Sequence, residues 1–482
     1  MFLFVVLGGC TVWLLEHNYI NDIALRRSAK LIGIFGAPQL RFENLGLVYP
    51  HLPYYLLVPF FWLPGLPPML APYLASICAG AGLLVFWQQQ MRDCGYGVKF
   101  RLAMLVAVIA HPYFLWAITS GTVQDAMSLV LFYVLYTTMA QLSGEEDVRA
   151  FILLALILAA YFFVDERALF LFFALLPLLP MIAPAQMMRT SPASVYAVIT
   201  FPFLASVASW AYLNGIFHSD PWLFWNSPES SFRGGWFRAP EVEWLRLYGG
   251  TWLRPILIAS LHALVSFPVL IWLLARVRRE RVLFAATVVL FLHPVIAIGF
   301  GTLKYFVTHP MGMLFLFSSG IMAGIVLMPP LGTVARRGMA TAMLMGVLGG
   351  WLSMSWSPDP EIRRWHDAVS GVQLQPQHQG DLALGLWLQR NRAPTLLDEN
   401  SGFRAIVARG DGKGLRLSFS EEFKMALKRD SPMIAQIAVP SPTGHGGRGD
   451  RINKQYPQLF ANGMARYQLV YDDEDWRVYQ RR

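Results

Sequence analysis

Long apolar blocks recur along the first three quarters of the chain and constrain its fold more than any other feature. Many of them run for roughly 17–25 residues, the length that an α-helix needs to cross the hydrocarbon core of a membrane. Helices are the default spanning form because lipid offers no partner to backbone polar groups. Only 14% of the residues are charged, whereas globular proteins average about 25%. The sequence therefore predicts a polytopic α-helical membrane protein.

Eleven transmembrane helices are predicted. The first apolar run has no basic segment before it and no clear small-x-small cleavage site, so we expect it to be a transmembrane helix, with a cleaved signal peptide as the alternative. The predicted spans are 1–15, 68–90, 102–119, 124–142, 150–164, 166–183, 193–213, 253–275, 282–300, 310–328 and 339–356. Arginine and lysine gather in the connections 91–101, 143–149, 184–192, 276–281 and 329–338, which share one side in this topology. The positive-inside rule then predicts a multi-pass protein of the cytoplasmic (inner) membrane, with a cytoplasmic N-terminus and an outer C-terminus.

The character of the sequence changes near residue 357, which divides the chain into two predicted domains. Residues 1–356 form the transmembrane domain, with two long outer loops at 16–67 and 214–252. Residues 357–482 contain short alternating apolar runs, which predict strands, and amphipathic runs, which predict helices. The predicted strands are 395–399, 415–419, 433–440, 466–473 and 475–480, and the predicted helices are 380–392 and 420–430. We expect a small soluble α/β domain outside the cytoplasm.

Charge and cysteine content exclude several other classes of function. The net charge of +9 comes with arginines that cluster in short loops, where orientation signals belong, so nucleic acid is not a predicted partner. The three cysteines, Cys10, Cys78 and Cys94, have no metal-type spacing and indicate neither a disulfide framework nor a zinc site.

Ionisable residues at the outer ends of the predicted helices are rare and therefore informative. Asp22 follows the first span, Asp125 opens the fourth, and Lys304 precedes the tenth. Asp165 and Glu166 lie in the turn between the fifth and sixth spans. The predicted topology places all of them on one side of the membrane, which indicates a shared polar site.

These residues also have structural interpretations. Asp125 suits the first turn of a helix, where the dipole favours a carboxylate. Residues 165–167 are typical of a hairpin turn with a local ion pair, and Lys304 could simply reach the interface along its aliphatic stem. Asp22 has the least structural reason to occur, since it stands between an apolar span and a basic amphipathic segment.

The first outer loop, 16–67, carries further candidates. Arg26, Glu43 and His51 occur there, and the basic residues oppose the topology rule. Such residues suit a substrate site, although an interfacial helix would also explain them. Residues 54–63 are too short to span and predict an interfacial or re-entrant helix.

The second outer loop, 214–252, combines basic and aromatic side chains. Arg233 and Arg238 could hold a phosphate through the bidentate guanidinium fork. Trp236 could stack on a sugar ring, while anchoring at the membrane interface is the alternative. A loop of this length is more often functional than a plain connection.

Four sequence stretches resemble the GT-C superfamily of membrane glycosyltransferases, which use polyprenyl-phosphate sugars. They are Asn21-Asp22 after the first span, VYPHLPYYLLVP (48–59), TSGTVQDAMSLVLFYVLYTTMAQL (119–142) and YLNGIFHSDPWLFWNSP (212–228). The resemblance covers residues 1–356, and a soluble extracytoplasmic tail is also common in the superfamily. It implies a GT-C-like fold and an inverting transfer of sugar to a glycan, lipid or protein acceptor of the cell envelope, such as a polysaccharide.

The resemblance also implies roles for the candidate residues. Asp22 and Asp125 are the expected catalytic carboxylates, with Asp22 as the base, and Mg²⁺ or Mn²⁺ held by the same two carboxylates is an alternative. The expected donor phosphate or lipid ligands are Arg26, Lys304, Arg233 and Arg238. The expected substrate-loop residues are Glu43, His51, Asp165, Glu166 and Trp236. The bilayer is a further partner.

Two other functions remain open from the sequence. One is a transporter or flippase of lipid-linked sugars, although the sequence has no internal repeat and its charges lie at one end of the helices, unlike typical transporters. The other is a non-catalytic assembly subunit that binds a partner of a membrane complex through its C-terminal domain.

Overall fold

The computed structural model describes most of the chain. The described residues are 2–37, 40, 50–142, 148–226, 249, 251, 253–277, 281–303, 310–327, 332–376, 378–428, 434–444, 447 and 449–482. Several predicted site residues lie outside them, namely Glu43, Arg233, Trp236, Arg238 and Lys304.

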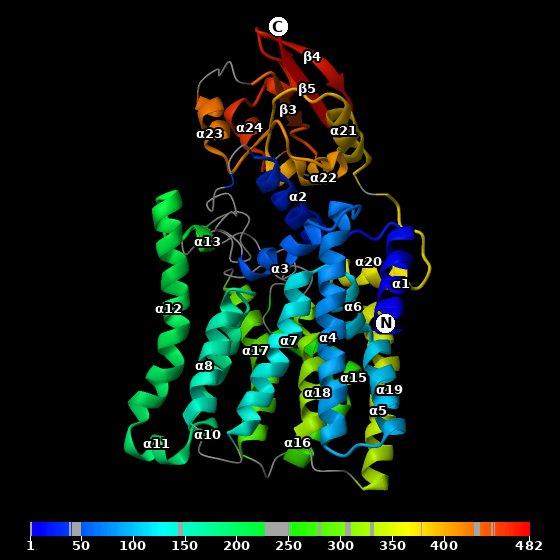
Figure 1. Cartoon of the computed structure of the whole chain (residues 1–482), viewed down its shortest axis with the longest axis vertical. Coiled ribbons are helices and arrows are strands. Elements are labelled where there is room, and N and C mark those ends of the chain that lie inside the picture. The colour runs from blue at the N-terminus through cyan, green and yellow to red at the C-terminus, as the bar shows by residue number, and fades with distance from the viewer. Residues whose placement is uncertain are drawn as a thin grey trace. The chain divides into compact units, whose positions relative to one another are not determined.

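Two compact units make up the chain, and each combines segments that are distant in sequence (Figure 1). The helical unit comprises Met1–Tyr19, Leu47–Pro53 and Ala75–Leu374, and the sheet unit comprises Ile20–Gly46, Tyr54–Leu74 and Gln375–Arg482. This division differs from the predicted boundary at 356/357. Most of the first outer loop groups with the C-terminal residues, and residues 357–374 group with the transmembrane helices.

The helical unit consists of helices that pack along one another. Its helices are α1 (Phe2–Glu16), most of α4 (Ala71–Asp93), α5 (Val98–Ala110), α6 (Pro112–Thr119), α7 (Val123–Gln141), α8 (Val148–Phe162), α9 (Ala168–Leu175), η3 (Leu176–Leu178), α10 (Leu179–Ile182), α11 (Ala185–Thr190), α12 (Pro192–His218), α13 (Leu223–Asn226), α15 (Leu253–Ser266), α16 (Val269–Val277), α17 (Arg281–Thr302), η4 (Pro310–Met313), α18 (Leu316–Leu327), α19 (Thr333–Ser355) and α20 (Pro360–Val369). Helix α8 packs against α7 and α12, and α7 packs against α18. Aromatic contacts occur in these seams, for example between Phe162 on α8 and Phe203 on α12, with ring centroids 5.4 Å apart.

Four helices among the described residues are long and apolar enough to cross a membrane. They are Pro68–Asp93, Pro192–His218, Phe284–Thr302 and Thr333–Ser355, and α5 with α6 makes a fifth if the bent pair is one span. The other apolar helices have 10–17 residues. The chain is a multi-pass membrane protein, as predicted, while the count of eleven spans stays a prediction.

Prolines divide two of the predicted spans. The span predicted at 102–119 bends by 66° between α5 and α6, where Pro112 opens the second helix. Proline disfavours helical backbone at the residue before it, and His111 is accordingly extended. The span predicted at 166–183 is divided into α9, η3 and α10, with Pro177 and Pro180 at the breaks.

A five-stranded mixed sheet forms the centre of the sheet unit, in the order β2-β1-β3-β5-β4. Strand β1 is parallel to β2 and β3, whereas β5 is antiparallel to β3 and β4. The strands are β1 (Thr395–Leu397), β2 (Leu415–Leu417), β3 (Gln436–Pro440), β4 (Tyr467–Asp472) and β5 (Trp476–Arg481). Each predicted strand is therefore confirmed, and with them the predicted α/β class of the C-terminal residues.

Helices cover both faces of this sheet, because successive strand residues point to opposite faces. The helical elements of the unit are α2 (Asp22–Gly36), most of α3 (Leu52–Phe61), η2 (Pro68–Leu70), α21 (Gln379–Arg390), α22 (Glu399–Arg409), α23 (Glu421–Lys428), α24 (Arg451–Gln455) and α25 (Leu459–Asn462). Leu397 and Val478 face one core, with α2, α21 and α22. Leu396 and Tyr479 face the other, with α23, α24 and α25.

Helix α2, from the first outer loop, belongs to the core of the sheet unit. Asn21 caps it by accepting from the backbone N–H groups of Ile23 and Ala24. Its apolar residues Leu25, Ala29 and Ile32 recur at the helical period and are buried against α22 and the sheet. The basic stretch is thus a helix that contributes to the core of the α/β unit.

The C-terminal end of α2 approaches the backbone of the sheet unit closely. A Cβ atom on Gly36 would lie 2.3 Å from the carbonyl carbon of Gly412. Because backbone atoms cannot swing aside like a flexible side chain, this contact requires glycine at the helix end.

Candidate active site

Two clusters of an arginine between two aspartates contain three of the six predicted site residues that the structure describes, namely Asp22, Asp125 and Asp165. The first cluster, Asp125–Arg167–Asp165, lies in the helical unit. Arg167 donates from Nε to Asp165 at 2.5 Å and from a terminal nitrogen to Asp125. Asp165 also accepts from the backbone N–H of Arg167 at 2.8 Å. The predicted ion pair within the 165–167 turn is present, and Arg167 additionally ties the turn to the first turn of α7.

This first cluster is closed to solvent. The side chain of Asp165 is fully buried, and those of Asp125 and Arg167 are 9% exposed. Ser128 donates to Asp165 at 3.1 Å. An arginine guanidinium is not deprotonated in proteins. The cluster therefore holds a permanent buried cation between two carboxylates, an arrangement suited to fixing helices.

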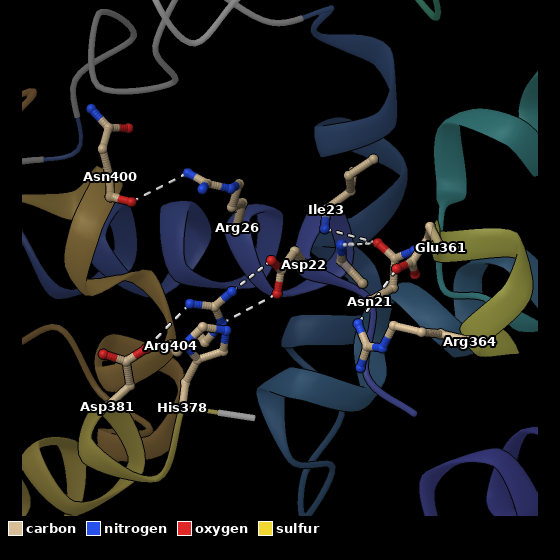
Figure 2. Close-up of polar contacts among 11 residues, drawn as sticks. Asn21, Asp22, Ile23, Arg26, Glu361, Arg364, His378, Asp381, Asn400 and Arg404 are labelled. Atoms are coloured by element: carbon tan, nitrogen blue, oxygen red, sulfur yellow. Dashed lines mark hydrogen bonds and ion pairs between the residues drawn. The ribbon is translucent and has the colours of Figure 1, made fainter. Parts of the chain in front are cut away.

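The second cluster, Asp22–Arg404–Asp381, lies in the sheet unit (Figure 2). Asp22 is the first residue of α2, and Arg404 reaches it from α22. Two guanidinium nitrogens donate to the two carboxylate oxygens, at 3.2 Å and 2.6 Å. The Asp22 side chain is nevertheless 42% exposed. It is the most exposed carboxylate in either cluster.

Asp381 anchors the other end of Arg404. It accepts from Arg404 at 3.2 Å and from the indole N–H of Trp476 at 2.6 Å, while Nδ1 of His378 lies 3.9 Å from the carboxylate. Burial raises the pKa of Asp381, and its contacts with Trp476 and Arg404 oppose that rise. His378 adopts a left-handed backbone with φ 60°, a conformation uncommon for residues other than glycine.

A polar pocket adjoins this second cluster. It contains about 350 Å³ of empty space, which includes open solvent at its mouth. Asp381 and Arg404 line it, with Ser401 at the start of α22, Ser441 after β3, and Trp476. The pocket therefore lies at the carboxyl ends of β1 and β3, the edge at which open α/β sheets commonly hold ligands.

Two other charged residues of α2, Arg26 and Lys30, contact α22. Arg26 donates to the carbonyl of Asn400 at 3.3 Å (Figure 2), and its guanidinium lies 4.1 Å from the ring centroid of Phe403. Lys30 pairs with Glu399 at 2.9 Å. Arg26, predicted to bind the donor, therefore lies within a few residues of Asp22, but its guanidinium is engaged by α22.

The remaining described candidates, His51 and Glu166, are buried in the helical unit. The ring of His51 lies 5.5 Å from that of Trp210 on α12. Burial lowers the pKa of His51 to about 4, so the imidazole is neutral at physiological pH. The structure thus gathers Asp125, Asp165 and Glu166 in one unit and Asp22 with Arg26 in the other.

The described residues give no additional support for the metal site predicted at Asp22 and Asp125. They include no group of three histidine, cysteine, aspartate or glutamate side chains arranged to hold a metal ion. The expectation that Asp22 and Asp125 share a divalent cation stays a prediction.

Sequence reasoning missed Arg404 and Asp381, the partners of Asp22. Arg404 is 382 residues away from Asp22 along the chain. Within α22 it looks like an ordinary surface arginine of an amphipathic helix. The one available signal was Asp22 itself, a carboxylate without a local partner at the start of a basic helix.

Comparison with known proteins finds a match at the level of structure only. No known family matches the sequence, and neither does any curated protein. A search of solved structures finds the crystal structure of ArnT from Cupriavidus metallidurans bound to undecaprenyl phosphate. The two chains are 12% identical with a TM-score of 0.56, and the match covers 99% of this chain and 97% of that one. This likeness shows that the chain has an ArnT-like fold, in agreement with the fold that the sequence resemblance implies.

Proposed function

We propose that this protein is an integral membrane glycosyltransferase that moves a sugar from a polyprenyl-phosphate donor to an acceptor outside the cytoplasm. The observation that carries the proposal is the likeness, over nearly the whole of both chains, to a protein crystallised with undecaprenyl phosphate. The acceptor would be a glycan, lipid or protein of the cell envelope. The enzyme would work at the outer face of the cytoplasmic membrane.

The proposed reaction is a single displacement that inverts the anomeric carbon. An acceptor hydroxyl attacks that carbon, the new C–O bond forms as the bond to the phosphate oxygen breaks, and polyprenyl phosphate leaves. A carboxylate takes the hydroxyl proton, and general bases of this kind contribute typically 10²–10⁴-fold.

Asp22 is the candidate base because its carboxylate is both held and accessible. An ionised carboxylate offers about four lone-pair directions, and Arg404 occupies two of them. The exposed part of the side chain leaves the others for an acceptor hydroxyl. Asp125 is less suited to proton transfer, since it is buried and paired with Arg167.

The leaving phosphate requires cations. Arg26, Arg233, Arg238 and Lys304 are the proposed ligands, with arginine supplying a bidentate fork and lysine a point charge. The proposed substrate-loop residues are Glu43, His51, Asp165, Glu166 and Trp236. A divalent cation could replace part of this positive charge.

The direct test is transfer by the purified protein. Radiolabelled polyprenyl-phosphate sugars and envelope glycans would be incubated with wild type, Asp22→Asn and the control Glu422→Gln, which changes an exposed carboxylate on α23. We expect transfer by wild type and the control and a loss of about 10²-fold or more in Asp22→Asn. Full activity of Asp22→Asn would show that Asp22 is not the base. Repeating the assay with a chelator tests whether transfer requires a divalent cation.

The bidentate contact between Asp22 and Arg404 also favours a second candidate, a non-catalytic assembly subunit, because docking of α2 by itself would explain the charge. Wild-type protein that transfers no sugar from any donor, but copurifies with a membrane partner lost on disrupting the sheet unit, would support it. Movement of intact donor across vesicles would instead indicate a flippase.

A further inference from the structure

We infer that Arg404 is a positioning residue for Asp22: α22 of the C-terminal part of the chain holds the proposed base of the first outer loop in one orientation. This inference rests on the proposed function, since it assigns Asp22 the role of base. It gives the C-terminal residues a part in the reaction itself, beyond that of an attached soluble domain.

The geometry of the contact fixes the carboxylate rather than merely neutralising it. Arg404 uses Nε and one terminal nitrogen, at 3.2 Å and 2.6 Å, so both oxygens of Asp22 are held by one planar group. Such a fork restricts rotation of the carboxylate, which a point charge such as lysine cannot do equally well.

Arg404 is itself immobilised. Its remaining terminal nitrogen donates to Asp381 at 3.2 Å, and Trp476 holds the opposite oxygen of Asp381 at 2.6 Å. The Arg404 guanidinium also lies 4.5 Å from the ring centroid of Phe403. Two buried residues of the sheet unit, Asp381 and Trp476, therefore hold Arg404 in place, and Arg404 in turn orients Asp22.

Contacts other than the Asp22–Arg404 pair also dock α2. Leu25, Ala29 and Ile32 attach the helix through the apolar core. Lys30 pairs with Glu399 two turns further along. The distinct effect of Arg404 is therefore confined to the first turn of α2, where helices fray and where Asp22 lies.

The charged surroundings of Asp22 come from three helices. Arg404 faces it from α22, and Asp381 with His378 lie behind Arg404 on α21. On α2 itself, Arg26 is directed to Asn400 and Phe403. Among the described residues, Arg404 is the cation within hydrogen-bonding distance of the Asp22 carboxylate.

The kinetic test compares Arg404→Gln and Arg404→Lys with the matched control Lys30→Gln, which removes the other buried cation linking α2 to α22. We expect Arg404→Gln to lower kcat by about 10²-fold, the effect of a small misplacement of a reacting group, with an unchanged KM for the donor. Arg404→Lys should recover part of kcat, and Lys30→Gln should retain it. Equal losses of kcat in Arg404→Gln and Lys30→Gln would show a docking role and overturn the inference.

A double variant sharpens this test. If Arg404 acts through Asp22, then Asp22→Asn combined with Arg404→Gln should be no slower than Asp22→Asn alone. Additive losses would show that Arg404 acts independently of Asp22, which contradicts the inference.

A measurement without catalysis separates this inference from the proposed function. Carbodiimide coupling of a small amine to carboxyl groups, read by mass spectrometry of the full-length protein, reports the accessibility of Asp22. We expect faster labelling of Asp22 in Arg404→Gln and unchanged labelling in Lys30→Gln. Unchanged labelling in both variants overturns the inference, whereas faster labelling in a protein that transfers no sugar overturns the proposed function alone.

Discussion

The Asp125–Arg167–Asp165 and Asp22–Arg404–Asp381 clusters use the same three charged groups in different surroundings. In the helical unit the aspartate side chains are 9% and 0% exposed, whereas in the sheet unit Asp22 is 42% exposed and Asp381 is 10% exposed. A carboxylate that is buried and paired cannot take a proton from a substrate without breaking the pair. Exposure of one end, and not the pattern of charges, therefore distinguishes the cluster suited to proton transfer from the one suited to holding helices together.

The largest effect should come from removing the central cation of the closed cluster. Arg167→Met leaves Asp125 and Asp165 buried without their counter-ion, which costs about 3–5 kcal/mol. We expect a strong fall in the melting temperature of the protein in detergent. The corresponding variant of the other cluster, Arg404→Met, should lower the melting temperature less because water can reach Asp22. Equal losses would mean that exposure does not distinguish the clusters.

Another buried carboxylate, Asp450, tests how burial and a neighbouring carboxylate act together. Burial and the nearby charge of Asp398 raise its pKa to about 6. The folded protein then keeps this proton to a higher pH than the unfolded chain, so the associated stability is present below about pH 4 and is lost as the pH rises to about 6.

Asp450→Asn should abolish this loss of stability at higher pH. The asparagine keeps a side-chain oxygen that can accept from the backbone N–H of Asn453 and so cap α24. We expect the variant to be more stable than wild type by about 1–3 kcal/mol at pH 7.5. The difference should disappear near pH 4. Thermal unfolding of both proteins across this range is the measurement, and a constant difference at all pH values would contradict the assignment.

A smaller loss of stability is expected from a substitution at the place where α2 meets the backbone of the sheet unit. Gly36→Ala would place a Cβ atom against Gly412 and should cost about 1–3 kcal/mol by overpacking. Gly82→Ala on α4 is the matched control, since no atom lies within 4 Å of the added Cβ. The control should be neutral or slightly stabilising. Equal melting temperatures for the two variants would show that α2 is not tightly packed.

The smallest effect on stability should come from Asp22→Asn. A half-exposed ion pair contributes about 0–1 kcal/mol, so the melting temperature should barely change while transfer is lost. Asp165→Asn is the counterpart in the closed cluster and should lower stability clearly. Destabilisation by Asp22→Asn as large as that by Asp165→Asn would assign both clusters a structural role.

Local signals in the sequence predict much of this architecture. Apolar length identifies the membrane class, and period-two alternation locates β1 to β5 within a few residues. The 165–167 ion pair is also local. Proline effects were underestimated, since the bend at Pro112 divides one predicted span into two helices.

The sequence could not predict which segments join which unit. Asp22 pairs with Arg404 and Lys30 pairs with Glu399 across more than 360 residues. No periodicity encodes such partners, because side-chain charge does not specify where in the chain its counter-ion lies. The same limit applies to Arg167 and Asp125, whose elements were predicted while their contact was not.

The place of α2 in the sheet unit has a consequence for synthesis of the protein. Asp22 emerges from the ribosome 382 residues before Arg404. At about 5–20 residues per second, roughly 20–75 s pass before its partner exists. Throughout that interval Asp22 and Lys30 are without their partners Arg404 and Glu399, so the earliest segment of the sheet unit is among the last to reach its final place.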